Sequence, residues 1–173
     1  NSTIMLGSSA FVGAINGSEN NRGTIAFGNS QTTNSSIGET HQVAIISVAN
    51  SADITLGNNI SGATINIGQG SSGKISTAGN NISANNINLN SGATLDVNIA
   101  STISGEINGS SSGAGLLQIS GSGSKIQSAA IGTTTKIAEF KTNDDISFTA
   151  NDDINADKIT IGNGASGILT QTA

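Results

Sequence analysis

The chain has 173 residues and a net charge of −5, and it contains 23 Gly and four Phe but no Cys, Pro, Trp or Tyr. Without Cys it has no disulfide and no thiolate metal site, and its six scattered basic residues argue against binding to nucleic acid or to an anionic membrane surface. No apolar run approaches the ~20 residues that span a bilayer. The length fits one domain. Because the sequence starts at Asn1 and has no signal peptide, we expect a segment of a longer protein.

The first fifty residues predict short strands separated by glycine. Alternating apolar and polar residues bounded by Gly, Asn or Ser are typical of a strand, and this pattern occurs over residues 3–6, 11–15 and 24–27. Residues 29–40 are mostly Asn, Ser, Thr and Gln and are predicted to form a loop. Residues 41–49 hold the longest apolar run, which is short for a buried helix and therefore predicts a strand.

The rest of the chain has aliphatic residues spaced about ten residues apart, each at the centre of a predicted strand. These centres are Ile54, Ile65, Ile75, Ile87, Val97, Ile107, Leu117, Ile126, Ile137, Ile146, Ile159 and Ile168. No stretch combines the 3.6-residue pattern of a helix with the residues that cap one. The spacing therefore predicts an all-β chain.

A repeated block shows how these strands are arranged. Gly57-Asn58-Asn59-Ile60-Ser61 returns at residues 79–83, an offset of 22 residues. Extended along the chain, the same alignment stacks aliphatic residues on one another: Ile65 on Ile87 and Ile75 on Val97. A fixed period in this range is typical of a solenoid, in which each residue lies over its counterpart one turn earlier, roughly 4.8 Å away.

Antiparallel hairpins are the alternative, but they favour two-residue turns and do not require a 22-residue repeat. A wound parallel coil places like residues over one another, so that Asn58/Asn80 and Asn59/Asn81 are predicted to form ladders of side-chain amides. We therefore predict a single-stranded parallel β-helix, or β-solenoid, with about 20–22 residues per turn.

The repeated unit returns near the end of the chain. Ile65-Asn-Ile-Gly-Gln-Gly-Ser-Ser-Gly is matched at residues 159–167 by Ile-Thr-Ile-Gly-Asn-Gly-Ala-Ser-Gly. One coil is therefore predicted to continue over residues 1–173 as a single solenoid segment. Residues 1–50 are less regular, and a cap could lie there, whereas residues 51–173 are predicted to form regular turns.

The chain resembles passenger domains of Gram-negative type V autotransporters, in particular the rickettsial surface cell antigens. The features that carry the resemblance are the Ile-x-Ile-Gly-x-Gly-Ala-Ser-Gly units, the Gly-Asn-Asn-Ile blocks and the absence of Cys. The resemblance implies a right-handed coil without enzymatic activity or cofactor, which acts in adhesion or display outside the cell and contributes to virulence. It also implies a C-terminal translocator barrel in the full-length protein, which would anchor the segment at the outer membrane without inserting it. The implied partner is a receptor on a host or neighbouring cell.

Two glycine-rich motifs match nucleotide sites in spacing only. Residues 68–73 and 162–167 spell the dinucleotide fingerprint, but strand-like sequence follows each one, where a helix N-terminus would have to receive the phosphates. Residues 109–113 match the spacing of a nucleophile elbow, which also needs a His and an acid. His41, the only His, has no partners for a zinc site. We therefore assign no catalytic, cofactor-binding or metal-binding residue.

The strongest candidates for chemistry are acidic. Asp144-Asp145 and Asp152-Asp153 each follow an Asn and recur eight residues apart. Such residues on adjacent loops could bind calcium, and two carboxylates in a groove could cleave a glycosidic bond, although turns favour Asn and Asp in any case. The alternative function is therefore a polysaccharide-acting β-helix enzyme or a phage tailspike-like protein. For a passenger, the predicted contact regions are the loops 29–40, 108–115 and 143–157.

Overall fold

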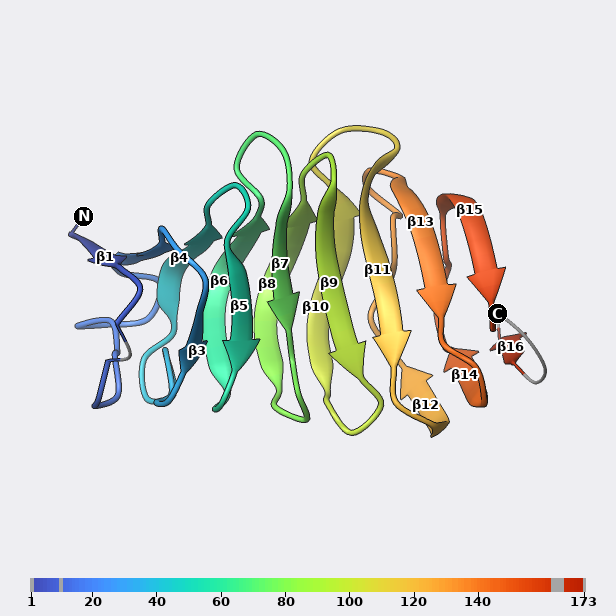
Figure 1. The fold of residues 1–173 in the computed structure, drawn as a ribbon, viewed down its shortest axis with the longest axis horizontal. Coiled ribbons are helices and arrows are strands. Elements are labelled where there is room, and N and C mark those ends of the chain that lie inside the picture. The colour runs from blue at the N-terminus through green and yellow to red at the C-terminus, as the bar shows by residue number, and fades with distance from the viewer. Residues whose placement is uncertain (1, 10, 163–166, 173) are drawn as a thin grey trace.

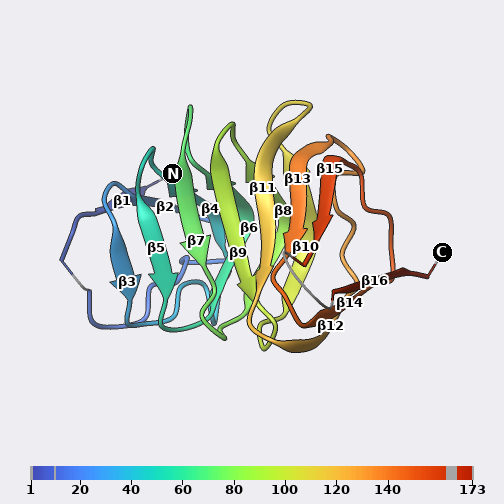
Figure 2. The ribbon, with the colours of Figure 1, turned by 45° about the vertical axis from the view of Figure 1, so that its right-hand side comes forward.

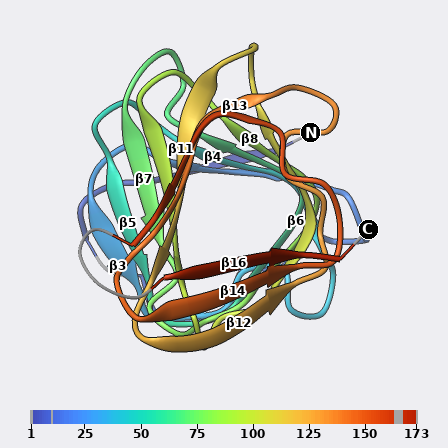
Figure 3. The same cartoon turned by 90° about the vertical axis from the view of Figure 1, so that its right-hand side faces the viewer.

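A computed structural model describes residues 2–9, 11–162 and 167–172, and in it the chain winds into a parallel β-solenoid of about 8 turns (Figure 1). The described residues contain strands and turns but no helix. Seen from the C-terminal end, the chain runs counterclockwise as it advances toward the viewer (Figure 3), so the coil is right-handed. The predicted right-handed parallel β-helix is thus confirmed.

Three parallel sheets form the faces of the coil (Figure 2). Sheet A consists of β1 (Thr3–Leu6), β2 (Thr24–Phe27), β4 (Val43–Val48), β6 (Ile60–Ile67), β8 (Ile82–Leu89) and β10 (Ile103–Gly109). Sheet B consists of β3 (Gln31–Thr33), β5 (Asp53–Leu56), β7 (Gly73–Ser76), β9 (Ala93–Asn98), β11 (Ala114–Ser120), β13 (Ile137–Thr142) and β15 (Ala156–Ile161). Sheet C consists of β12 (Gly123–Gln127), β14 (Ile146–Ala150) and β16 (Ile168–Gln171).

The 22-residue repeat sets the register of sheet A as predicted. Ile60 pairs with Ile82, and Ile65 pairs with Ile87, in neighbouring turns. In sheet B, however, Ile75 pairs with Leu95, so the predicted pairing with Val97 is wrong by two residues. The reason is the corner between the sheets, which spans residues 68–72 after β6 but only residues 90–92 after β8. A shorter corner moves every later residue forward along its strand.

Stacked aliphatic side chains fill the interior of the coil. Ile65, Ile87, Ile75 and Leu95 are completely buried, and they belong to one continuous cluster that runs from the first turns to β14. Burying a side chain of this size contributes about 1.5–3 kcal/mol. Because each turn covers the apolar surface of its neighbours, a chain with few aromatic residues still forms a dry core.

Asparagines at one corner connect successive turns through the backbone rather than through amide ladders. The side-chain oxygen of Asn59 accepts a hydrogen bond from the backbone N–H of Asn81, 2.8 Å away, and Asn81 does the same for Thr102 at 2.7 Å. Asn80 instead donates to the carbonyl oxygen of Leu56. The predicted amide-to-amide ladders are therefore wrong here, because an amide at a corner reaches the free backbone group of the next turn first.

Within the first fifty residues, one segment is more regular than predicted and another is less regular. Residues 29–40, predicted as a loop, contain β3, and Ile37 forms backbone bridges to the turns on both sides. The predicted strand over residues 11–15 is reduced to a single bridge at Ile15. The predictions for 3–6 and 24–27 match β1 and β2.

Strand β12 reverses the expected arrangement of side chains. Ile126 is 66% exposed, whereas Lys125 and Gln127 are 6% and 3% exposed and point into the coil. The Lys125 ammonium donates to the carbonyl oxygen of Ser101, and the Gln127 amide donates to that of Ile103 at 3.2 Å. Burial lowers the pKa of Lys125, because a charged ammonium loses its hydration there.

Candidate functional site

The three segments predicted as contact loops lie within the wound coil. Residues 29–40 include β3, residues 108–115 form the corner from β10 to β11, and residues 143–157 carry β14. Each segment is therefore part of a regular turn rather than an insertion between turns. A binding surface has to be sought on the faces and ends of the coil.

The two acidic pairs lie at opposite ends of the same strand. Asp144-Asp145 forms the corner before β14, and Asp152-Asp153 forms the corner after it. Since β14 has 5 residues in extended conformation, the pairs are roughly 15–20 Å apart. Asp153 accepts one hydrogen bond from the side-chain amide of Gln171 at 3.1 Å. The carboxylates therefore do not converge in the groove that sugar cleavage by these four residues would require.

The neighbouring acids make ion pairs across turns. Lys136 pairs with Asp157, and Lys158 pairs with Glu139 at 3.0 Å. Glu139 also accepts a hydrogen bond from the hydroxyl of Thr160 at 2.7 Å. The Thr160 hydrogen bond and then the Lys158 pair hold the pKa of Glu139 below its ordinary value. These contacts join β13 to β15, so we interpret them as supports for the last turns.

Metal coordination finds no support in this geometry. Within residues 2–9, 11–162 and 167–172, no three His, Asp or Glu side chains lie close enough together to hold a metal ion. His41 is exposed just before β4, and its backbone carbonyl accepts a hydrogen bond from Gly17.

The glycine motifs form corners. Gly68 and Gly70 have φ of 70° and 107°, which favour glycine, and β7 follows them instead of a helix. The second fingerprint begins at Gly162, but residues 163–166 lie outside the described part of the chain. Residues 109–113 make the corner between β10 and β11, with Gly113 at φ 73°. A phosphate site at a helix N-terminus is thus absent from the described motif at 68–73.

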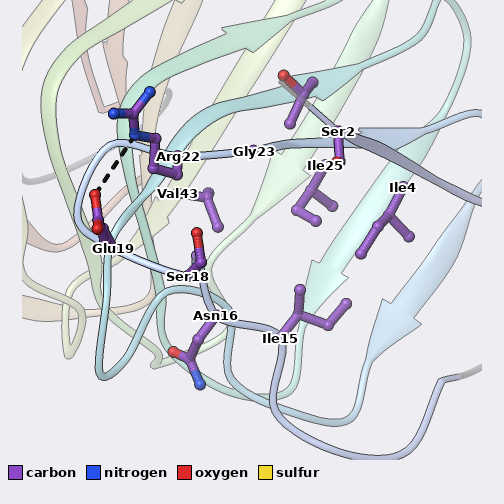
Figure 4. Close-up of a pocket in the computed structure, with 12 residues that line it drawn as sticks. Ser2, Ile4, Ile15, Asn16, Ser18, Glu19, Arg22, Gly23, Ile25 and Val43 are labelled. Atoms are coloured by element: carbon purple, nitrogen blue, oxygen red, sulfur yellow. Dashed lines mark ion pairs between the residues drawn. The ribbon is translucent and has the colours of Figure 1, made fainter.

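One hollow lies at the N-terminal end of the coil. It encloses about 530 Å³ (Figure 4), and its apolar floor is formed by Ile4, Ile15 and Ile25. Arg22 and Glu19 face each other at its edge with 3.8 Å between charged atoms, and both side chains are mostly exposed. Such an exposed pair contributes little to binding or stability. The hollow lies beside β1, the N-terminal edge strand of sheet A.

A second hollow, which we call the amide groove, lies on the outer face of sheet A. It encloses about 520 Å³. All of its lining residues are uncharged and none is aliphatic or aromatic: Asn66, Gln69, Gly70, Asn86, Asn88, Asn90, Asn108, Gly109, Ser110, Thr134 and Thr135. A concave surface with convergent polar groups is the usual form of a binding site.

Parallel register explains why these amides gather. Asn66, Asn88 and Asn108 occupy equivalent positions on β6, β8 and β10, one per turn. Along β8, Asn86 and Asn88 alternate with buried Ile87, so both side chains point outward. The groove is therefore a grid with amides roughly 4.8 Å apart along the coil and about 7 Å apart along the strand.

Some of these amides are fixed and others are available. Asn88 donates to the side-chain oxygen of Asn66 at 2.9 Å, which is an amide ladder between turns. The buried Asn108 accepts from the backbone N–H groups of Thr134 and Thr135 at 3.1 and 3.2 Å. By contrast, the exposed side chains of Asn86 and Gln69 make no hydrogen bond within the described residues.

Sequence reasoning did not identify the groove. A usable signal was present, because Asn86, Asn88 and Asn90 alternate with Ile87 and Leu89 on one predicted strand. That alternation places three amides on the face opposite the core.

The described residues include no helix that is long and apolar enough to cross a membrane. Comparisons of the chain with protein-family models, with curated protein sequences and with solved structures find no match.

Proposed function

We propose that this chain is a non-enzymatic passenger segment of a bacterial autotransporter, which acts as a stalk in adhesion or display outside the cell. The observation that supports this most directly is the continuous stack of turns around an aliphatic core, from β1 to β16. About 8 turns at ~4.8 Å each give a rod roughly 40 Å long. Because each turn is hydrogen-bonded to the next, the rod is stiff.

The composition of the outer faces fits the same proposal. The interior is filled mainly by Ile, Leu, Val and Phe, so a ligand would have to bind on a face or at an end. Sheet A presents the amide groove there. In the full-length protein, a translocator barrel would carry this segment to the surface, and the receptor would lie on a host or neighbouring cell.

Surface display tests this function directly. The chain is fused to the barrel of an unrelated autotransporter in a non-adherent bacterium, and adherence to epithelial cells is compared with that of bacteria displaying the barrel alone. We expect increased adherence that soluble chain inhibits. Equal adherence at equal surface amounts would contradict adhesion by this segment.

The same material tests the alternative of a polysaccharide-acting enzyme. Purified chain is incubated with neutral and acidic polysaccharides, and the release of new reducing ends is measured. We expect none. Release that Asp144→Asn or Asp152→Asn abolishes would overturn the non-enzymatic assignment.

A further inference from the structure

The amide groove has a composition that restricts its ligand. Its walls consist of six carboxamides, three hydroxyl residues and two glycines. A carboxamide offers both donors and an acceptor, and a hydroxyl offers one donor and two lone pairs. A matching ligand must therefore donate and accept hydrogen bonds at many closely spaced points.

The absence of charged residues from the groove wall restricts the class of ligand further. No Lys, Arg, Asp or Glu lines the groove, so an ionic ligand would lose hydration without gaining an opposite charge. Glu106 is in register with Asn86 on the neighbouring strand, and its carboxylate accepts hydrogen bonds from Asn108 at 3.3 Å and Thr134 at 3.2 Å, so its negative charge beside the groove also disfavours an anionic ligand. The chemistry therefore favours a neutral ligand.

Part of the groove is also fixed in shape before any ligand binds. Asn88 is held by Asn66 in the neighbouring turn, and Asn108 is held by the backbone of residues 134–135. Beneath them, Ile87 and Leu89 are fully buried in the core. Fixed donors and acceptors lose little conformational freedom on binding, which favours affinity.

We propose that the amide groove binds a neutral glycan chain, with the free amides of Asn86 and Gln69 making the first contacts. This inference rests on the proposed function, because the glycan would be the ligand through which the passenger adheres. Sugar hydroxyls supply the dense pattern of donors and acceptors that the groove requires. Without an aromatic residue on which a sugar ring could stack, binding is weak, with a dissociation constant on the order of millimolar.

Nuclear magnetic resonance of the isotope-labelled chain tests whether the amide groove binds a neutral glycan. The probes are malto-, cello-, laminari- and chito-hexaose, each titrated to about 10 mM, tenfold above the expected dissociation constant. We expect at least one to shift the side-chain amide signals of Asn86, Asn88 and Gln69. An oligogalacturonate of the same length should bind more weakly because of its charge. No shift with any neutral probe, or shifts confined to another face, would overturn the proposal.

A matched pair of variants provides the control. Asn86→Ala should weaken binding about fivefold, the effect of one lost hydrogen bond, whereas Asn85→Ala should leave it unchanged. Asn85 is the adjacent residue of β8, is also exposed and does not line the groove. Equal effects of the two substitutions would contradict the assigned site. If a Gly-Ser peptide shifts the same signals as strongly as the glycans, the groove recognises peptide groups and the glycan assignment is wrong.

The groove and the proposed function can fail separately. If no glycan binds but displayed chain still confers adherence, the groove proposal fails and the adhesive function stands. If a glycan binds in the groove but display confers no adherence, the groove proposal stands and adhesion by this segment fails.

Discussion

Truncating one stacked isoleucine tests the packing on which the fold depends. Ile87 is 0% exposed and lies between Ile65 and Ile107 in the neighbouring turns. Ile87→Ala removes three carbon groups, which corresponds to about 2–2.5 kcal/mol of lost burial. The turns above and below are hydrogen-bonded ~4.8 Å apart and cannot close the cavity. We therefore expect a total loss of about 3–4 kcal/mol in the free energy of unfolding.

Ile126→Ala is the matched control. Both residues are aliphatic centres in the same sequence spacing, but Ile126 is 66% exposed on β12. Its truncation should change the free energy of unfolding by no more than about 0.5 kcal/mol. Urea unfolding followed by circular dichroism gives both values, and hydrogen exchange in β8 reports local opening if the coil does not unfold in one step. Similar losses for the two variants, or a loss below about 1 kcal/mol for Ile87→Ala, would refute the packing argument.

Three further substitutions test other features of the coil. Lys125→Met should stabilise the protein by about 1–2 kcal/mol, because it removes a buried ammonium that has no carboxylate partner among the described contacts. Since the pKa of Lys125 is lowered, the stability of the wild type should also rise as the pH increases toward the ordinary lysine value of 10.5, and the variant should lose that rise. Gly105→Ala should destabilise the fold by about 2 kcal/mol or more, because Gly105 has φ 107° and the added Cβ would lie 2.0 Å from the carbonyl oxygen of Ala84. An unchanged urea midpoint would contradict this. Glu139→Gln should remove part of the stability that the wild type has above pH 4.5. A carboxyl whose pKa is lowered by folding stabilises the fold at pH values above its pKa in the unfolded chain, and this effect is lost as the pH falls through the folded pKa. Identical acid-unfolding curves would show that the Thr160 and Lys158 contacts contribute nothing.

Much of the architecture could be predicted because the coil repeats itself. The pairing of Ile65 with Ile87 follows from two copies of one block at a fixed offset, and the structure confirms it. The pairing of Ile75 could not be obtained in this way. It depends on the length of the corner before it, and a corner can lose two residues while the strands that follow still pair in parallel.

The direction of side chains in β12 escaped prediction for a different reason. Alternation shows that neighbouring residues face opposite sides, but it does not show which side faces the core. Apolar content would place Ile126 inside. Instead, Lys125 and Gln127 reach the carbonyl oxygens of Ser101 and Ile103, which lie one turn earlier. These bonds connect residues 24 positions apart, so no local pattern could indicate them.

The amide groove follows from the same register that forms the core. When Ile65 and Ile87 are stacked inside the coil, their neighbours Asn66 and Asn88 must be stacked outside it. A period selected for packing therefore also aligns side chains on the outer face, without any separate device to hold them. The backbone of such a surface is held by the core, because a strand that carries an outward amide can move only if the buried isoleucine beside that amide moves as well.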